Sequence, residues 1–178
     1  MPLITNPQVL LLDEPLSALD PFLRIRMRGE LKKLQRETGI SFIHVTHGQD
    51  EALALADEIV VMNNARIEQA GTARDVFNAP QTEFVARFIG GHNVMALEGK
   101  RFALRSDRTR IGASDQGFDA AVLGFEFLGP HVAVSLMGPG DTDLVAMIPK
   151  ESFYAAPLDL GATVRVGWDA ADLHQLAS

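Results

Sequence analysis

A short apolar run that ends in two adjacent carboxylates constrains the fold of this chain more than any other stretch. The run Val9-Leu10-Leu11-Leu12 lies between Pro7 and Pro15, and it is followed directly by Asp13 and Glu14. Consecutive apolar residues bounded by proline predict a short strand that is buried on both faces, as in a parallel sheet. The two acids then lie at the carboxyl end of that strand, where open α/β sheets bind their ligands.

The two carboxylates suit the chemistry of phosphoryl transfer. An Asp at this position can hold Mg²⁺ directly or through water, because hard oxygen ligands suit that ion. A neighbouring Glu can orient or deprotonate a water molecule that attacks a phosphoryl group. Two acids alone are equally compatible with a charged turn that simply ends a strand.

A strand–helix–strand unit is predicted around this run. Asp20 as N-cap and Pro21 at the first helical position predict a helix start, and Thr38-Gly39 predicts the end of that helix. The β-branched and aromatic stretch 40–46 predicts a second buried strand. A right-handed βαβ unit of this kind brings the next residue, His47, to the same crevice as the two acids.

The remaining pattern divides at Gly90-Gly91, the clearest predicted boundary in the chain. Before it we expect helices over 49–57, 72–77 and 82–89, and strands over 58–62 and 66–69. After it we expect short alternating strands over 94–97, 101–104, 121–128, 131–137, 144–148 and 163–168. Several short strands without a long helix predict a small β-barrel. The expected domains therefore cover residues 1–90 and 91–178.

Three segments resemble one known family. Residues 9–20 resemble the Walker B motif and D-loop of ABC transporter ATPases, and residues 41–52 resemble that family's switch-histidine segment. The part after Gly91 resembles the OB-type TOBE regulatory domain of spermidine/putrescine, iron and maltose importers, with Arg105-Ser106-Asp107 where Arg-Pro-Glu is common. The resemblance implies an α/β fold, in which a partial RecA-like P-loop NTPase sheet lacking the P-loop half precedes a small all-β barrel.

The resemblance also implies roles for individual residues. Asp13 would fix Mg²⁺ through its water shell, and Glu14 would be the catalytic carboxylate that holds the hydrolytic water in line with the γ-phosphate. His47 would hydrogen-bond the γ-phosphate or that water, next to Gly48, which replaces an Asp usual in the family. The residues expected along the dimer interface, near the opposite subunit's ATP, are Ser17, Ala18, Leu19 and Asp20.

The motifs that bind the nucleotide phosphates are not found in the sequence as printed. Its Gly-Lys pair, Gly99-Lys100, has Val94 where the first glycine of a phosphate loop belongs and Arg101 where Ser or Thr belongs. A Leu-Ser-Gly-Gly-Gln signature is also missing. We therefore expect a truncated chain that does not hydrolyse ATP alone. In the family the P-loop strand lies between the strands at 40–46 and 58–62, so truncation should leave a gap in the sheet. The two strands could then collapse together, pair with another chain or stay loose.

Composition limits the class of partner. The net charge of −7 argues against nucleic acid. No apolar run approaches the ~20 residues needed to span a bilayer, and the absence of cysteine suits a cytosolic protein. The resemblance implies a cytoplasmic location at the inner face of the plasma membrane, a second ATPase subunit in a homodimer, and transmembrane permease subunits, without direct insertion into the membrane.

Two functional hypotheses remain open at this point. In the first, the chain is the ATP-binding and ATP-hydrolysing subunit of an ABC importer for a polyamine-like solute, with ATP and Mg²⁺ as its family cofactors. In the second, it is a non-enzymatic regulatory, dimerisation or small-ligand-binding module that carries a relic ATPase segment. An upstream reading frame that encodes a P-loop and a signature would favour the first hypothesis.

Overall fold

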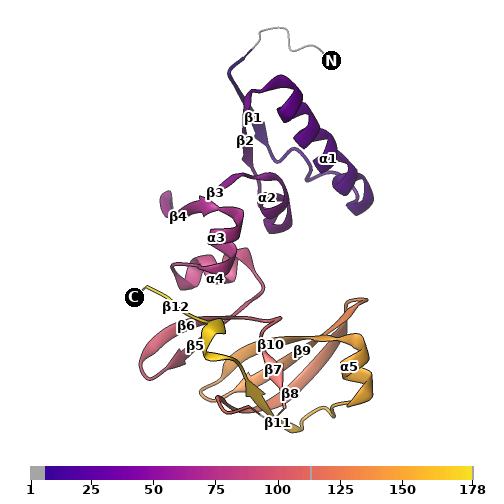
Figure 1. Cartoon of the computed structure of the whole chain (residues 1–178), viewed down its shortest axis with the longest axis vertical. Helices are drawn as coiled ribbons and strands as arrows, with labels where there is room; N and C mark the ends of the chain where they lie inside the picture. Colours follow the sequence, from indigo (N-terminus) through magenta and orange to yellow (C-terminus); the bar gives the residue numbers. More distant parts are fainter. Residues whose placement is uncertain (1–6, 113, 178) are drawn as a thin grey trace. The chain divides into compact units, whose positions relative to one another are not determined.

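The computed structural model describes residues 7–112 and 114–177 (Figure 1). They divide into two compact units, one up to Val76 and one from Phe77 onward. The predicted fold class, α/β followed by all-β, is confirmed. Each unit is described by itself below.

The first unit begins with the expected strand–helix–strand unit. Strand β1 (Val9–Asp13) is followed by helix α1 (Pro21–Thr38) and strand β2 (Ser41–Val45). The two strands pair in parallel, and Asp13 lies opposite Val45 in the register. The helix starts where the sequence predicts, because the Asp20 side chain accepts a hydrogen bond from the backbone N–H of Leu23 at 2.9 Å.

The prediction that these strands are buried on both faces is wrong. Side chains alternate along β1 and β2 between half-buried and exposed positions. Leu11 and its neighbour Ile43 on the exposed face are 64% and 52% exposed. Burial on both faces needs a covering layer on each, and the described residues of this unit cover only one.

The rest of the first unit is a short helix and a hairpin. Helix α2 (Gln49–Leu55) ends earlier than expected, and it leads into the antiparallel strands β3 (Glu58–Asn63) and β4 (Arg66–Thr72). In the part of the chain that the structure describes, β1–β2 and β3–β4 form two separate two-stranded sheets. Among the described residues, strands β2 and β3 are thus not paired with each other.

The isolated strand pairs lead to a prediction about local stability. Two-stranded sheets are marginal by themselves, whereas three or more strands with a buried face can be stable. We therefore expect amide hydrogens of β1 to β4 to exchange much faster than those of the sheets after residue 92, as measured by hydrogen–deuterium exchange. Equal protection in both units, with a single melting transition, would contradict this expectation.

Two short helices connect to the second unit. Helix α3 (Ala73–Asn78) is followed by α4 (Glu83–Ile89). The core cluster that contains Ala86 of α4 also contains Val94, Ala103 and Leu176. Helix α4 therefore packs with residues that follow it in the sequence, and the predicted boundary at Gly90-Gly91 falls inside the second unit. The domain boundary itself stays a prediction.

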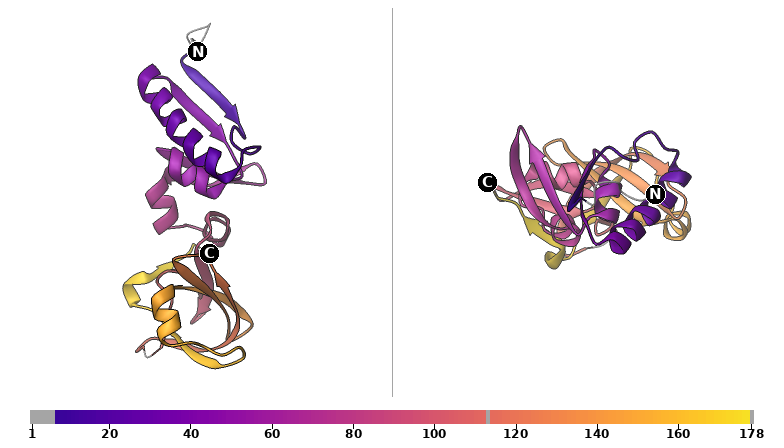
Figure 2. Two further views of the ribbon diagram at one scale, coloured as in Figure 1. Left: turned by 90° about the vertical axis from the view of Figure 1, so that its right-hand side faces the viewer. Right: turned by 90° about the horizontal axis from the view of Figure 1, so that it is seen from above.

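The second unit consists of two antiparallel sheets that curl around one core (Figure 2). The three-stranded sheet has the order β12 (Leu173–Gln175), β6 (Lys100–Arg105), β5 (His92–Leu97). The five-stranded sheet has the order β10 (Thr142–Pro149), β9 (His131–Gly138), β8 (Gly117–Phe127), β11 (Thr163–Gly167), β7 (Arg110–Ile111). Residues of both sheets share the core, including Leu104, Val122, Val134 and Val166.

Several short elements of this unit have no counterpart in the expected pattern. They are β7, β12, helix α5 (Lys150–Ala155) and the 3₁₀ turn η1 (Ala170–Asp172). The two strands have only two and three residues, too few for alternation to be recognised. They form because longer strands distant in sequence provide the pairing partners.

Candidate functional site

The carboxyl ends of β1 and β2 place the two principal site residues next to each other. The backbone N–H of Glu14 donates to the carbonyl of Val45 at 2.8 Å, which extends the parallel pairing by one residue. Glu14 has a positive φ of 43°, so the chain turns sharply after the strand. The Nε2 atom of His47 lies 3.2 Å from Oε1 of Glu14.

This pair is open to solvent. The side chains of His47 and Glu14 are 86% and 42% exposed. A polar contact this exposed contributes little to stability, so it is not needed to hold the fold together. The two side chains lie at the carboxyl ends of neighbouring parallel strands, the edge of a sheet at which open α/β folds bind their ligands.

Asp13 lies beside this pair as the last residue of β1. It is exposed and shares the uncovered face of the strand with Leu11. Two adjacent carboxylates fit a hydrated Mg²⁺ whose other ligands are water and phosphate oxygens. The described residues contain no group of three or more acidic, histidine or cysteine side chains that could hold a metal ion by themselves.

The segment after Glu14 is a hydrogen-bonded turn. The hydroxyl of Ser17 donates to the carbonyl of Glu14 at 3.0 Å, and the N–H of Leu19 donates to the carbonyl of Leu16 at 3.2 Å. Leu16 is buried and anchors the turn, whereas Ser17, Ala18 and Asp20 are exposed. Asp20 is engaged as the helix cap, and the expected role of these residues at a dimer interface stays a prediction.

Sequence reasoning missed three contacts in and around the His47 segment. The hydroxyl of Thr46 donates to Oε2 of the buried Glu51 at 3.1 Å and accepts the N–H of Gly48 at 3.0 Å. Arg28 of α1 forms an ion pair with Asp50 of α2, and the hydrogen bond from Arg28 lowers the pKa of Asp50. No local pattern predicts these contacts, because each depends on how the turn and the two helices meet.

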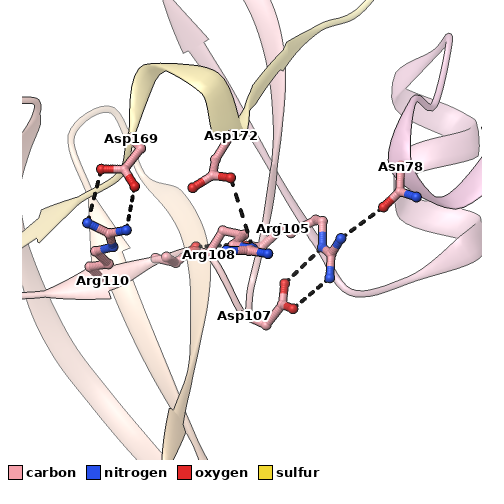
Figure 3. Close-up of polar contacts among 8 residues, drawn as sticks. Asn78, Arg105, Asp107, Arg108, Arg110, Asp169 and Asp172 are labelled. Atoms are coloured by element: carbon pink, nitrogen blue, oxygen red, sulfur yellow. Dashed lines mark hydrogen bonds and ion pairs between the residues drawn. The ribbon is translucent and has the colours of Figure 1, made fainter.

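The second unit has a separate set of charged residues, drawn in Figure 3. Arg105 donates two hydrogen bonds to Asp107 at 2.9 and 2.7 Å and one to Asn78 at 2.8 Å. Its guanidinium lies 5.1 Å from the ring centroid of Phe77. Arg105 thus connects the end of β6 to Phe77 and Asn78 in the last turn of α3, and its role is structural.

The neighbouring arginines in Figure 3 are paired in the same way. Arg110 forms a two-pronged ion pair with Asp169, and Nε of Arg108 lies 4.0 Å from Asp172. These contacts connect the segment around β7 to the turn η1. Because each guanidinium already faces a carboxylate, this cluster offers little attraction for an anion.

Comparison with known proteins identifies the second unit first. Residues 102–176 match the model of the TOBE domain. The chain also resembles a "Spermidine/putrescine import ATP-binding protein PotA" of Bacillus thuringiensis (strain Al Hakam), with 38% identity over 96% of this chain. The resemblance to ABC transporter ATP-binding subunits is confirmed.

Other relatives carry the same name as the Bacillus protein. The protein of Mesoplasma florum is 44% identical over 67% of this chain and 37% of its own length. That of Clostridium novyi (strain NT) is 56% identical over 66% of this chain and 34% of its own length. The chain covers 53% of the Bacillus protein, so it spans about half the length of the curated relatives it matches.

A solved structure of the cytoplasmic molybdate-binding protein ModG is also similar. The match covers 44% of this chain and 61% of the ModG chain, with a TM-score of 0.41 and 15% identity.

Among the helices that the structure describes, none combines the length and the apolar character required to cross a bilayer.

Proposed function

We propose that this chain contributes the Walker B motif, D-loop and switch histidine of an ATP-hydrolysing subunit that drives solute import. The observation that carries this proposal is the contact between His47 and Glu14 at the ends of two parallel strands. The similarity to spermidine/putrescine import ATP-binding proteins supports it and favours a polyamine-like solute.

Each site residue has a distinct task in this proposal. Bound Mg²⁺-ATP supplies the phosphoryl group and neutralises part of its charge. Asp13 accepts hydrogen bonds from the water shell of the ion, and the carboxylate of Glu14 holds and orients the hydrolytic water. His47, whose ring is exposed beside Glu14, donates a hydrogen bond to that water or to the γ-phosphate. Positioning and charge account for most of the catalysis of phosphoryl transfer.

The partners follow from the same proposal. Ser17, Ala18, Leu19 and Asp20 meet a second ATPase subunit, and their exposed turn is free for such a contact in this single chain. The subunit attaches to transmembrane permease subunits from the cytoplasmic side. The TOBE domain regulates the assembly and does not bind nucleic acid, in keeping with the net charge of −7.

A non-enzymatic module is the second candidate function. The sequence as printed contains no G-x-x-x-x-G-K-[ST] motif. Without such a loop, backbone N–H groups and a lysine that hold the β- and γ-phosphates are missing. In this case the chain would serve in regulation or dimerisation, or bind a small ligand. Asp13 and Glu14 would then have no catalytic role.

Calorimetry can compare the affinity of this chain alone for Mg²⁺-ATP with that of a complete ATPase. We expect this chain alone to bind no tighter than about millimolar, because three or four charge-assisted hydrogen bonds worth about 1.5–3 kcal/mol each are missing. The same chain preceded by a P-loop and signature segment should bind and hydrolyse ATP. Micromolar binding of ATP by the chain alone, abolished in Asp13→Ala, would contradict the first expectation. A fusion that binds ATP without hydrolysing it would favour the non-enzymatic module.

A further inference from the structure

The ring of His47 has little packing to hold it in place. Its side chain is 86% exposed, and its contact with Glu14 is exposed to solvent and weak by itself. Its position relative to Glu14 therefore depends on the backbone of the turn between β2 and α2. The contacts that fix this turn decide whether the two side chains meet.

A single hydroxyl closes that turn. The hydroxyl oxygen of Thr46 accepts a hydrogen bond from the N–H of Gly48 at 3.0 Å, and the hydroxyl donates one to Oε2 of Glu51 at 3.1 Å. The carbonyl of Gly48 in turn accepts the N–H of Glu51 at 3.1 Å. The three residues thus form a closed set of hydrogen bonds around the backbone of His47.

Glu51 is the anchored member of this set. It is only 4% exposed, so its carboxylate lies where a polar group without hydrogen bonds is costly. The hydroxyl of Thr46 is the donor that the structure gives to Oε2, and Oε1 is buried without a partner among the described residues. Because the buried carboxylate of Glu51 has little freedom to move, its hydrogen bond fixes the side chain of Thr46. Thr46 in turn fixes the backbone of the turn through its bond to Gly48.

The space around Gly48 supports the same arrangement. A Cβ atom added there would lie 3.3 Å from both the Cβ of Glu51 and the hydroxyl oxygen of Thr46. The turn is therefore close-packed at this point, with no side chain of residue 48 to hold it. Arg28 and Asp50 fix α2 to α1 one residue before Glu51.

We infer that Glu51, acting through Thr46, is a positioning residue that holds the turn in which His47 meets Glu14. The geometric part of this inference stands by itself, and only its consequence for catalysis rests on the proposed function. Loss of the hydroxyl or of the buried acceptor frees the turn, and the imidazole then leaves the carboxylate of Glu14.

The test uses nuclear Overhauser effects in the full chain without nucleotide. In the wild type, ring protons of His47 should show an effect to the γ-protons of Glu14. Thr46→Val keeps the shape but removes the hydroxyl, so this effect should fall by at least about threefold, as the distance averages over a freed turn. Thr46→Ser, the matched control, should retain it.

A second pair of variants tests the carboxylate, and cross-strand effects between β1 and β2 monitor the fold. Glu51→Leu should behave like Thr46→Val, and Glu51→Gln should retain the effect because its amide oxygen still accepts a hydrogen bond. An unchanged His47–Glu14 effect in Thr46→Val, or its absence in the wild type, would overturn the inference. Simultaneous loss of the β1–β2 effects in both Thr46→Val and Glu51→Leu would also overturn it, since the role would then be structural.

A kinetic readout links the inference to the proposed function. In the fusion with a P-loop and signature segment, Thr46→Val should lower kcat by about 10- to 100-fold with little change in KM, as expected for misplacement of a group. Normal kcat in a variant that has lost the His47–Glu14 effect would contradict the role proposed for His47. The positional inference would survive that result.

Discussion

Glu14→Gln is expected to lower ATP turnover by about 100-fold or more while ATP binding is retained, in a protein where a P-loop and signature segment precede this chain. The amide keeps the size of the side chain but removes the charge that orients and activates the hydrolytic water. It also replaces the carboxylate whose Oε1 lies 3.2 Å from Nε2 of His47. ATP-bound dimers should therefore accumulate.

The measurement is steady-state phosphate release, together with sizing of the complex in ATP. Glu58→Gln provides a matched control, because Glu58 is also an exposed glutamate at a strand end but lies on β3, in the other two-stranded sheet of this unit. The control should leave turnover unchanged. Near-normal turnover in Glu14→Gln would remove Glu14 from the role of catalytic carboxylate.

The sequence predicted the part of the fold that depends on local signals. The apolar run before Asp13 and the β-branched run before His47 predict parallel strands, and the structure pairs them in that way. The Asp20-Pro21 pair predicts the helix start, and Asp20 caps the helix. From these elements it follows that His47 and Glu14 lie close together.

The parts that were missed depend on contacts between distant segments. Burial of Leu11 and Ile43 requires a covering layer, which their own sequence does not specify. Ala86 of helix α4 belongs to one core cluster with residues as far along the chain as Leu176. The contact of Thr46 with Glu51 arises from the shape of one turn. Hydrophobic periodicity indicates which face of a helix or strand is apolar, but not which segment packs against that face.

Asn93 is a further residue that no motif singled out, although it joins the two sheets of the TOBE unit. It is 4% exposed. Its Oδ1 accepts the N–H of Val145 at 2.7 Å, and its Nδ2 donates to the carbonyl of Val145 and to the hydroxyl of Thr109, each at 2.8 Å. The side chain thus takes the place of a backbone pair between β5 and β10, and every polar atom of the amide is used.

Asn93→Ala is therefore expected to destabilise the second unit by about 2–4 kcal/mol, because an unmade buried hydrogen bond costs about 1–3 kcal/mol. That loss is a large share of the ~5–15 kcal/mol that stabilises a domain. Trp168 is the single tryptophan and is buried in this core, so its fluorescence during denaturant unfolding reports on this unit alone.

Asn93→Asp is the matched variant for this experiment. Its carboxylate can still accept the N–H of Val145 but cannot donate to the carbonyl of Val145 or to Thr109. An ionised carboxylate facing that carbonyl at a buried site is unfavourable, so Asn93→Asp should be destabilising at neutral pH and should recover part of its stability at pH values where it is protonated. The alanine variant has no such group and should show no recovery of this kind. A change below about 1 kcal/mol in Asn93→Ala would mean that the two sheets are held together by their apolar core and not by this side chain.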